Sequence, residues 1–384
     1  MPLRVRVRVA LVRIGFLLGR LLGPPRRRVV LATSHAARLT GNLAFIHDEL
    51  ARREPPVPTA VLAFRATAST RGLVVGSLAS LRSGFLLASS RVTIVDDYFQ
   101  PMYAVTPRAG TRYVQVWHAA GAFKKFGYST LSKSFGQTEE LVSAFPIHTN
   151  YDVALVSAGQ FAPYYAEAFR QPLDVFDASI GIPRTDVLFG ERAVAAEARV
   201  RAHYRLPARR IVLYAPTFRG DSVLRARAPQ GLDLAELQRE LGEDHLILLR
   251  QHPFVRNLRP LDPALDGFVI DVSDYPDIHE LMLVSDVLVT DYSSAMYEFS
   301  LLGRPIVFFA PDHDDYHDER GFYFDYRTGV PGPVFETTRD VAAYLRAGEF
   351  DLERVARFRD ESFDVADGHA TERLVDRIVL PALG

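Results

Sequence analysis

A histidine and two lysines follow a predicted strand in the sequence YVQVWHAAGAFKKFG, residues 113–127. The strand ends at Trp117, the only tryptophan of the chain, and His118. His118 is a candidate general base, because an imidazole titrates near neutral pH and the small residues after it would let a ligand reach the backbone. Lys124 and Lys125 could neutralise an anionic substrate, although exposed lysines are usually only solvated. This loop predicts one half of a phosphoryl-transfer site.

A second histidine follows another predicted strand in the sequence LLRQHPFV. Pro253 restricts His252 to an extended backbone, which fixes the direction of the imidazole. From there His252 could donate a hydrogen bond to a phosphate oxygen or a proton to a leaving group. Arg250 lies two residues earlier. A histidine at a strand end is often structural, so this prediction depends on the neighbouring motifs.

Two hydroxyl-bearing motifs also follow predicted strands. YAPTFRGD places Thr217 and Arg219 where α/β folds often bind nucleotide phosphates, although a polar turn explains these residues equally well. DVLVTDYSSAMYEF presents Asp291, Ser293 and Ser294 at the start of a helix, where amides, hydroxyls and the helix dipole favour a phosphate. Ordinary capping of the helix by Asp291 or Ser293 is the alternative.

A third polar cluster, in PDHDDYHDERGFYFDY, superficially resembles a set of metal ligands. No regular helical or strand spacing brings all of these side chains to one point, and acids in a loop can simply be solvated. We therefore expect no metal site and no cofactor here. The residues concerned are His313, Asp314, Asp315, His317 and Asp318.

The elements that must position these residues are short apolar strands alternating with helical stretches. This alternation predicts an α/β fold with parallel sheets and helices on both faces. A chain of 384 residues is long enough for two domains. We expect an N-terminal segment, two Rossmann-like domains whose strand ends face each other across a cleft, and C-terminal helices that pack back on the first domain. The corresponding ranges are 1–28, 29–205, 206–355 and 356–384.

Composition narrows the functional classes. A net charge of -1 argues against a general nucleic-acid-binding protein, which usually carries a basic excess. The absence of cysteine excludes disulfides, thiolate catalysis and cysteine-ligated zinc. With 48% hydrophobic residues the chain has the composition of an ordinary globular protein.

The N-terminal segment MPLRVRVRVALVRIGFLLGRLLGPPRRR is strongly basic, because no acid precedes Asp48. Its apolar run is too short and too charged to span a bilayer, and no small-residue cleavage site follows it. A helix here would place Val7, Leu11, Ile14, Leu18 and Leu21 on one face, whereas RVRVRV could equally alternate as a strand. We predict an interfacial helix attracted to anionic lipid, with a helix packed on the protein body as the alternative. The arginines are Arg4, Arg6, Arg8, Arg13, Arg20, Arg26, Arg27 and Arg28.

Five motifs in this order resemble the CDP-glycerol glycerophosphotransferase family, the teichoic acid primases and polymerases. They are WHAAGAFKKFG, LYAPTFRGD, RQHP, DVSDYPDIHELMLVSDVLVTDYSSAMYEF and GRPIVFFAPDHDDYHDERGFYFDY, within residues 110–335. Many polymerase members read Trp-His-Gly-Thr-Pro-Leu-Lys where this chain has Trp-His-Ala-Ala-Gly-Ala-Phe-Lys. The variant found here is more similar to the primase and short-chain members.

The resemblance implies a GT-B-type fold and a cytoplasmic enzyme that is peripheral on the inner face of the cell membrane. It implies a CDP-glycerol or CDP-ribitol donor on the C-terminal domain, and a lipid-linked saccharide or polyol-phosphate acceptor on the N-terminal domain. His118 and His252 match the family's two histidines, and Asp291, Ser293 and Ser294 match its phosphate site.

We therefore expect an acceptor hydroxyl to attack the β-phosphorus of CDP-glycerol while His118 takes its proton and CMP leaves. The acceptor side is expected to use Trp117, Lys124 and Lys125. The donor side is expected to use Thr217, Arg219, Arg250, His252, Asp291, Ser293, Ser294 and Glu298.

Three further hypotheses belong to other functional classes. A nucleotide-sugar glycosyltransferase would need acids or amides for the sugar ring, and this region offers no obvious acid pair apart from Glu298. A non-catalytic scaffold would not need to keep both His118 and His252. A metal-dependent phosphoesterase would have to use the HDDYHD cluster.

Overall fold

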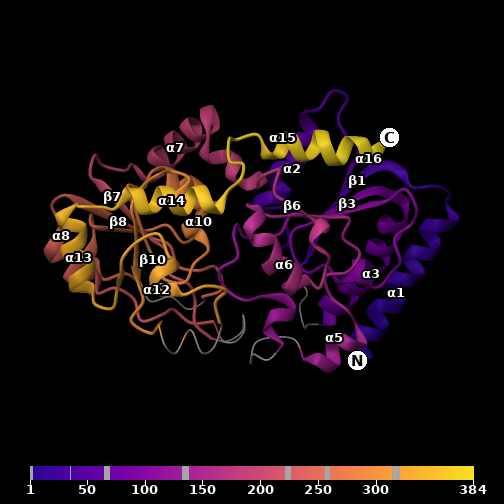
Figure 1. The fold of residues 1–384 in the computed structure, drawn as a ribbon, viewed down its shortest axis with the longest axis horizontal. Helices are drawn as coiled ribbons and strands as arrows, with labels where there is room; N and C mark the ends of the chain where they lie inside the picture. The colour runs from indigo at the N-terminus through magenta and orange to yellow at the C-terminus, as the bar shows by residue number, and fades with distance from the viewer. Residues whose placement is uncertain are drawn as a thin grey trace.

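The protein is described by a computed structural model that covers residues 3–34, 36–64, 70–131, 138–220, 226–255, 260–313, 316 and 321–384. It consists of two α/β units, each built on a six-stranded parallel sheet (Figure 1). The α/β class with two parallel sheets that the sequence predicts is confirmed.

The N-terminal sheet has the strand order β2-β1-β3-β4-β5-β6. Its interior strand β1 is fully buried from Val29 to Ala32, as expected for a parallel sheet covered on both faces. The strands are β1 (Arg26–Thr33), β2 (Thr59–Ala63), β3 (Ser90–Val95), β4 (Arg112–Gln115), β5 (Val153–Leu155) and β6 (Phe176–Asp177). The helices of this unit are α1 (Leu3–Leu21), α2 (Gly41–Arg52), α3 (Thr70–Ser89), α4 (Gln100–Tyr103), α5 (Glu139–Ala144) and α6 (Ala162–Phe169).

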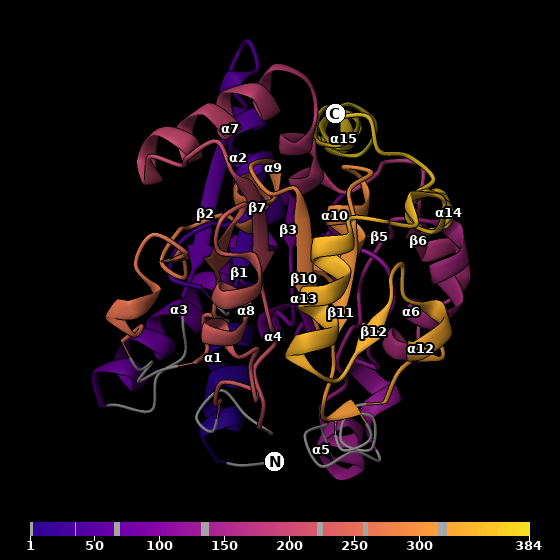
Figure 2. The ribbon, with the colours of Figure 1, turned by 90° about the vertical axis from the view of Figure 1, so that its left-hand side faces the viewer.

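The C-terminal sheet has the order β12-β11-β10-β7-β8-β9, and Figure 2 turns this unit toward the viewer. Because β7 lies between β10 and β8, the loops that follow these three strands leave the sheet side by side. The strands are β7 (Arg210–Tyr214), β8 (His245–Leu249), β9 (Val269–Asp271), β10 (Val287–Thr290), β11 (Ile306–Phe309) and β12 (Val334–Phe335). The helices are α7 (Gly190–Tyr204), α8 (Leu234–Leu241), α9 (Ile278–Leu283), α10 (Ala295–Ser300), α12 (Tyr326–Gly329), α13 (Thr338–Ala347) and α14 (Leu352–Ser362).

The end of the chain returns from the second unit to the first. On α14, Phe358 stacks on Tyr297 of α10, with 5.1 Å between the ring centroids. The next helix, α15 (Ala370–Leu374), caps its first amides with the buried carboxylate of Asp186. A π-helical turn (Val375–Val379) and α16 (Leu380–Leu383) follow, and Figure 1 shows them lying over the N-terminal unit.

The N-terminal segment is a helix, which decides between the two alternatives left open by RVRVRV. α1 packs closely on α3, because a β-carbon on Gly15 would lie 1.9 Å from the Leu81 carbonyl oxygen and one on Gly84 would lie 1.9 Å from that of Val12. Val12 is buried, whereas the predicted apolar face, including Leu18 and Leu21, is exposed. No helix within the described residues is long and apolar enough to cross a membrane.

Candidate functional site

A pocket of about 310 Å³ lies between the two units, where strand ends of both sheets meet. Its N-terminal wall is the loop after β4, residues 117–126, and its C-terminal wall comes from the loops after β7, β8 and β10. Of the residues predicted from the sequence, it brings together Trp117, His118, Lys124, Lys125, Thr217, His252, Ser293 and Ser294.

His118 is held with one ring nitrogen toward the protein. Its Nδ1 lies 3.1 Å from the carbonyl oxygen of Asp96, and a carbonyl can only accept, so Nδ1 donates. In the neutral ring the basic lone pair is therefore on Nε2. The Asp97 carboxylate lies 3.8 Å from Nδ1.

Trp117 helps to fix the position of the His118 ring. Its backbone is left-handed, with φ of 49°, and its amide donates to the Gln115 side chain at 2.8 Å. The buried indole packs against His118 and Phe169, with centroid distances of 4.3 Å and 5.2 Å. The strand end thus turns sharply and carries the imidazole into the pocket.

His252 has the opposite tautomer. The amide of Phe254 donates to its Nδ1 at 3.2 Å, so the neutral ring carries its hydrogen on Nε2. Burial, followed by the Lys124 and Arg250 cations, lowers the pKa of His252 to about 4. Near neutral pH this ring is therefore an uncharged hydrogen-bond donor at Nε2.

The hydroxyls on the C-terminal wall differ in how firmly they are held. Thr217 donates to Asp291 through both its amide and its hydroxyl, at 2.8 Å and 2.9 Å. Ser293 accepts from the amide of Ala295 at 3.2 Å, and Ser294 is the N-cap of α10, without a side-chain capping bond. The N-cap is therefore Ser294, and not Asp291 or Ser293 as the capping alternative expected.

Asp291, Arg219 and Arg250 do not line the pocket. Arg219 forms ion pairs with Asp291 and with Asp312, at 2.9 Å and 2.6 Å, and its guanidinium lies over the rings of Tyr292 and Tyr316. Arg250 donates to two backbone carbonyls after β9, the nearer at 2.6 Å. These side chains do not touch the pocket themselves, but they connect the loops that form its C-terminal wall.

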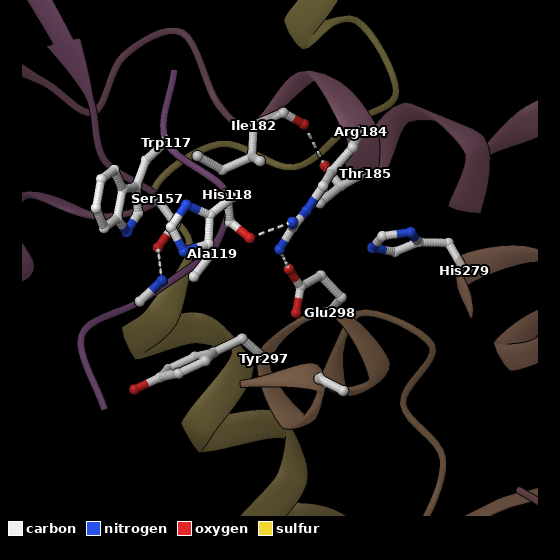
Figure 3. Close-up of polar contacts among 12 residues, drawn as sticks. Trp117, His118, Ala119, Ser157, Ile182, Arg184, Thr185, His279, Tyr297 and Glu298 are labelled. Atoms are coloured by element: carbon white, nitrogen blue, oxygen red, sulfur yellow. Dashed lines mark hydrogen bonds and ion pairs between the residues drawn. The ribbon is translucent and has the colours of Figure 1, made fainter. Parts of the chain in front are cut away.

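Glu298 also lies outside the pocket. Its partner, Arg184, is not among the residues predicted from the sequence. Figure 3 shows Arg184 donating both to the carbonyl oxygen of His118 and to the carboxylate of Glu298. Glu298 is buried, which raises the pKa of a carboxyl, but the Arg184 guanidinium outweighs this effect and lowers it. This ion pair links α10 of the C-terminal unit to the strand end that carries His118.

Asn42 completes this link from α2. Its amide nitrogen donates to the carbonyl oxygens of Val116 and Trp117, at 2.9 Å and 2.8 Å, and its oxygen accepts from the Arg184 amide at 2.9 Å. Two segments far apart in the sequence, one with Asn42 and one with Arg184, therefore fix the backbone at His118 and just before it.

The two lysines lie where the N-terminal loop meets the C-terminal unit. Lys124 pairs with Phe322 in an antiparallel bridge, and the Lys125 amide donates to the carbonyl oxygen of Gly321 at 3.1 Å. The ammonium of Lys124 lies 3.4 Å from the Tyr316 hydroxyl. Lysine charge therefore lies beside His252 and the two serines, as an anionic ligand would require.

The third polar cluster gives no metal site within the described residues. His313 lies against the ring of Tyr326, with 5.1 Å between centroids. The other members of that cluster, Asp314, Asp315, His317 and Asp318, lie outside the described residues.

Residues 20–380 match the family model described as CDP-Glycerol:Poly(glycerophosphate) glycerophosphotransferase. The chain is 35% identical over 380 residues to a teichoic acid poly(ribitol-phosphate) polymerase of Bacillus spizizenii, covering 98% of this chain and 60% of that protein. It is also 35% identical over 367 residues to a teichoic acid ribitol-phosphate primase of that species, covering 94% of this chain and 93% of the primase.

Among solved structures, the chain is similar to the wall teichoic acid polymerase TagF. The TM-score is 0.78 at 25% identity, over 96% of this chain and 93% of the TagF chain. Together with the two parallel sheets, this likeness confirms the GT-B-type fold that the sequence motifs predict.

Proposed function

Because this chain belongs to the CDP-glycerol:poly(glycerophosphate) glycerophosphotransferase family, we propose that it transfers an alditol phosphate from a CDP-activated donor to an acceptor hydroxyl. The product would be a teichoic acid or a related cell-surface polymer. The expected donor is CDP-glycerol, and the expected acceptor is a lipid-linked saccharide or polyol phosphate.

One observation carries this proposal: two imidazoles from different units line one pocket and have opposite tautomers. Nε2 of His118 offers a lone pair, whereas Nε2 of His252 offers a hydrogen. A phosphoryl transfer needs a base at the attacking oxygen and donors at the phosphate and leaving group. The pair of rings supplies both without a covalent intermediate.

The proposed reaction is an in-line displacement. The acceptor oxygen forms a bond to the β-phosphorus, and the bond from that phosphorus to the bridging oxygen of the diphosphate breaks, so that CMP leaves. His118 takes the hydroxyl proton at Nε2. His252, Ser293, Ser294 and Lys124 would hold the phosphate oxygens, and positioning and charge stabilisation would supply most of the acceleration.

CDP-ribitol is a second candidate donor, and one comparison favours it. One relative, of which the alignment covers 93%, is a ribitol-phosphate primase. The Trp-His loop also resembles the primase and short-chain members more than the polymerases. We propose addition of one or a few units for this reason.

We further propose that the protein works on the inner face of the cell membrane, as a peripheral protein. The support is α1, whose leucines Leu17, Leu18 and Leu21 are 57%, 47% and 73% exposed although their neighbour Phe16 is buried. Exposed leucines interspersed with Arg13 and Arg20 are typical of a helix that lies in a lipid interface.

The test is to incubate the protein with each donor in turn and a lipid-linked disaccharide acceptor, and to follow CMP release and product length. We expect acceptor-dependent CMP release with short products. No CMP release from either donor, in the presence of acceptor and anionic lipid, would contradict the proposed function.

A further inference from the structure

A second cleft, of about 640 Å³, lies between α1 and two turns of the N-terminal unit, residues 103–106 and 145–150. It is separate from the pocket between the units. Figure 1 places α1 on the outer side of the N-terminal unit, far from the C-terminal unit. The side chains of this cleft that bear on its chemistry are Arg13, Leu17, Arg20, Thr106, Thr149 and Asn150.

The walls of this cleft are fixed before any ligand arrives. Val12 of α1 is buried in a small core with Ala104 and Phe145, which belong to the two turns. The Asn150 amide ties the turns together by donating to the carbonyl oxygens of Met102 and Val105, at 2.8 Å and 2.9 Å. A preformed cleft loses little conformational entropy when a ligand binds.

The charge of the cleft selects an anion. Arg13 and Arg20 lie seven residues apart on α1, two helical turns, and both face the cleft, whereas no acidic residue lines it. Arg13 uses its Nε to donate to the Ala104 carbonyl oxygen at 3.1 Å, which directs the guanidinium toward the cleft. Neither arginine has an ion pair with a carboxylate in the part of the chain that the structure describes. Guanidinium groups and hydroxyls together are well suited to a phosphate.

An apolar surface continues directly from the cleft. Leu17 lines the cleft and is 57% exposed, and Ile14, Leu18 and Leu21 on the adjacent face of α1 are 50%, 47% and 73% exposed. A free phosphate ion would use only the arginines. A molecule with a phosphate and hydrocarbon chains would use both surfaces.

We propose that this cleft binds the phosphate headgroup of an anionic membrane lipid, with the acyl chains lying along the exposed leucines of α1. The inference rests on the proposed membrane location but not on the donor or the reaction. It gives the attachment a defined orientation, because the headgroup would be held by the outer side of the unit that carries His118.

The test is a calorimetric titration of the full chain with dihexanoylphosphatidylglycerol below its micelle concentration, in the absence of donor and acceptor. We expect saturable binding by the unaltered protein. In the Arg13→Gln/Arg20→Gln variant we expect about 25-fold weaker binding, from about fivefold for each arginine removed. The Arg20→Gln variant gives a second measurement, with a loss of about fivefold, that leaves the Arg13 bond to the protein body intact.

The matched control is Arg6→Gln/Arg27→Gln, which removes the same charge from the same segment at positions that do not line the cleft. We expect its affinity to equal that of the unaltered protein. Equal losses in the control and the cleft variants, or no saturable binding at all, would overturn the proposal. Glycerol phosphate binding as tightly as the short-chain lipid would overturn the assignment to a lipid. Because no turnover is measured, these outcomes are independent of whether CMP is released.

Discussion

The two pocket histidines differ in the nitrogen that carries their hydrogen, and this difference comes from two backbone contacts. A carbonyl oxygen of Asp96 fixes His118, and an amide hydrogen of Phe254 fixes His252. Backbone groups cannot change their donor or acceptor character, so the tautomers are set by the fold. The chemistry of the site follows from where these two short loops place a carbonyl and an amide.

Replacing His118 by alanine should lower the turnover number about 10² to 10⁴-fold, because the attacking hydroxyl loses its base. CDP binding should change little, since His118 belongs to the N-terminal wall, where we propose that the acceptor binds. Rates of CMP release and calorimetric CDP affinity check both statements, with the exposed His203→Ala as the control. Near-normal turnover in His118→Ala would show that another group is the base.

The lowered pKa of His252 predicts a stability that depends on pH. Its folded pKa of about 4 lies below the ordinary value of 6.5, so the unfolded chain takes up this proton first as the pH falls. The stabilising effect of the neutral ring is complete above pH 6.5 and is lost between about 6.5 and 4, at up to about 1.4 kcal/mol per pH unit.

Urea unfolding of the ligand-free protein at pH 7 and pH 5 measures this effect. His252→Gln should reduce the pH dependence, whereas the control His203→Gln, at an exposed position, should not. A dependence should remain in His252→Gln, because burial lowers the pKa of His148 to about 3. An unchanged dependence in His252→Gln would mean that the ring is not buried in neutral form.

Sequence reasoning at the residue scale placed eight side chains in the pocket but misjudged how others would be oriented. The histidines, serines, lysines, Trp117 and Thr217 all follow strand ends, and strand ends of parallel sheets meet. Arg219 follows a strand end too and Glu298 lies in α10, yet each is held by an oppositely charged partner. Those partners, Asp312 and Arg184, lie 93 and 114 residues away, so no local pattern reveals them.

At the scale of elements, the ion pair between Arg184 and Glu298 joins the 3₁₀ helix η4 (Pro183–Leu188) to α10. The side chains of Arg184 and Glu298 are 14% and 2% exposed, so the ion pair is largely shielded from solvent. Through the His118 carbonyl, the pair also couples the relative position of the two units to the position of His118. A loop that carried His118 without this support would sample more orientations.

Glu298→Gln should therefore impair both stability and rate. Removing one partner leaves the Arg184 charge buried, at a cost of about 3 kcal/mol, and a displaced His118 should slow turnover about 10 to 100-fold. Chemical unfolding and CMP release measure the two effects. The matched control is Glu280→Gln, which breaks the more exposed pair with Arg199 and should change stability by less than about 1 kcal/mol. If Glu298→Gln behaved like this control, the pair would have no role in placing His118.

The strands and helices could be predicted from the sequence because short apolar runs alternate regularly with helical stretches. The sequence left α1 undecided, since alternating arginine and valine fit both a strand and a helix. The structure decides it through contacts that a single sequence does not show: Gly15 and Gly84 allow α1 and α3 to approach closely. Asp291 or Ser293 was expected to cap α10, but the N-cap is Ser294, because adjacent serines are equally good capping residues and the sequence does not decide between them.

Over the whole molecule, α1 presents two different surfaces. Val9, Val12 and Phe16 are buried, so the helix is part of the fold, while its leucines remain exposed. Deleting residues 1–28 would therefore expose α3 and remove the first three residues of β1, and would confound any test of membrane binding. Point substitutions on the exposed side avoid this problem.

Leu18→Gln/Leu21→Gln should weaken flotation with anionic vesicles at least about 10-fold, because burying each leucine contributes about 1.5 to 3 kcal/mol. Their exposure of 47% and 73% means that the fold should be unaffected. Val194→Gln/Leu352→Gln, at 70% and 48% exposure on the other unit, is the control. Undiminished flotation would refute the membrane-binding function of this helix.

The two units bring His118 and His252 to one pocket, and the central claim is that this pocket holds the donor diphosphate. A crystal structure with bound CDP tests this claim most directly. We predict that the diphosphate lies in the pocket, within hydrogen-bond distance of His252 Nε2 and of Ser293 or Ser294. His118 Nε2 should face the β-phosphate from the opposite wall. A diphosphate bound elsewhere, or one reached by only one of the two imidazoles, would contradict the account.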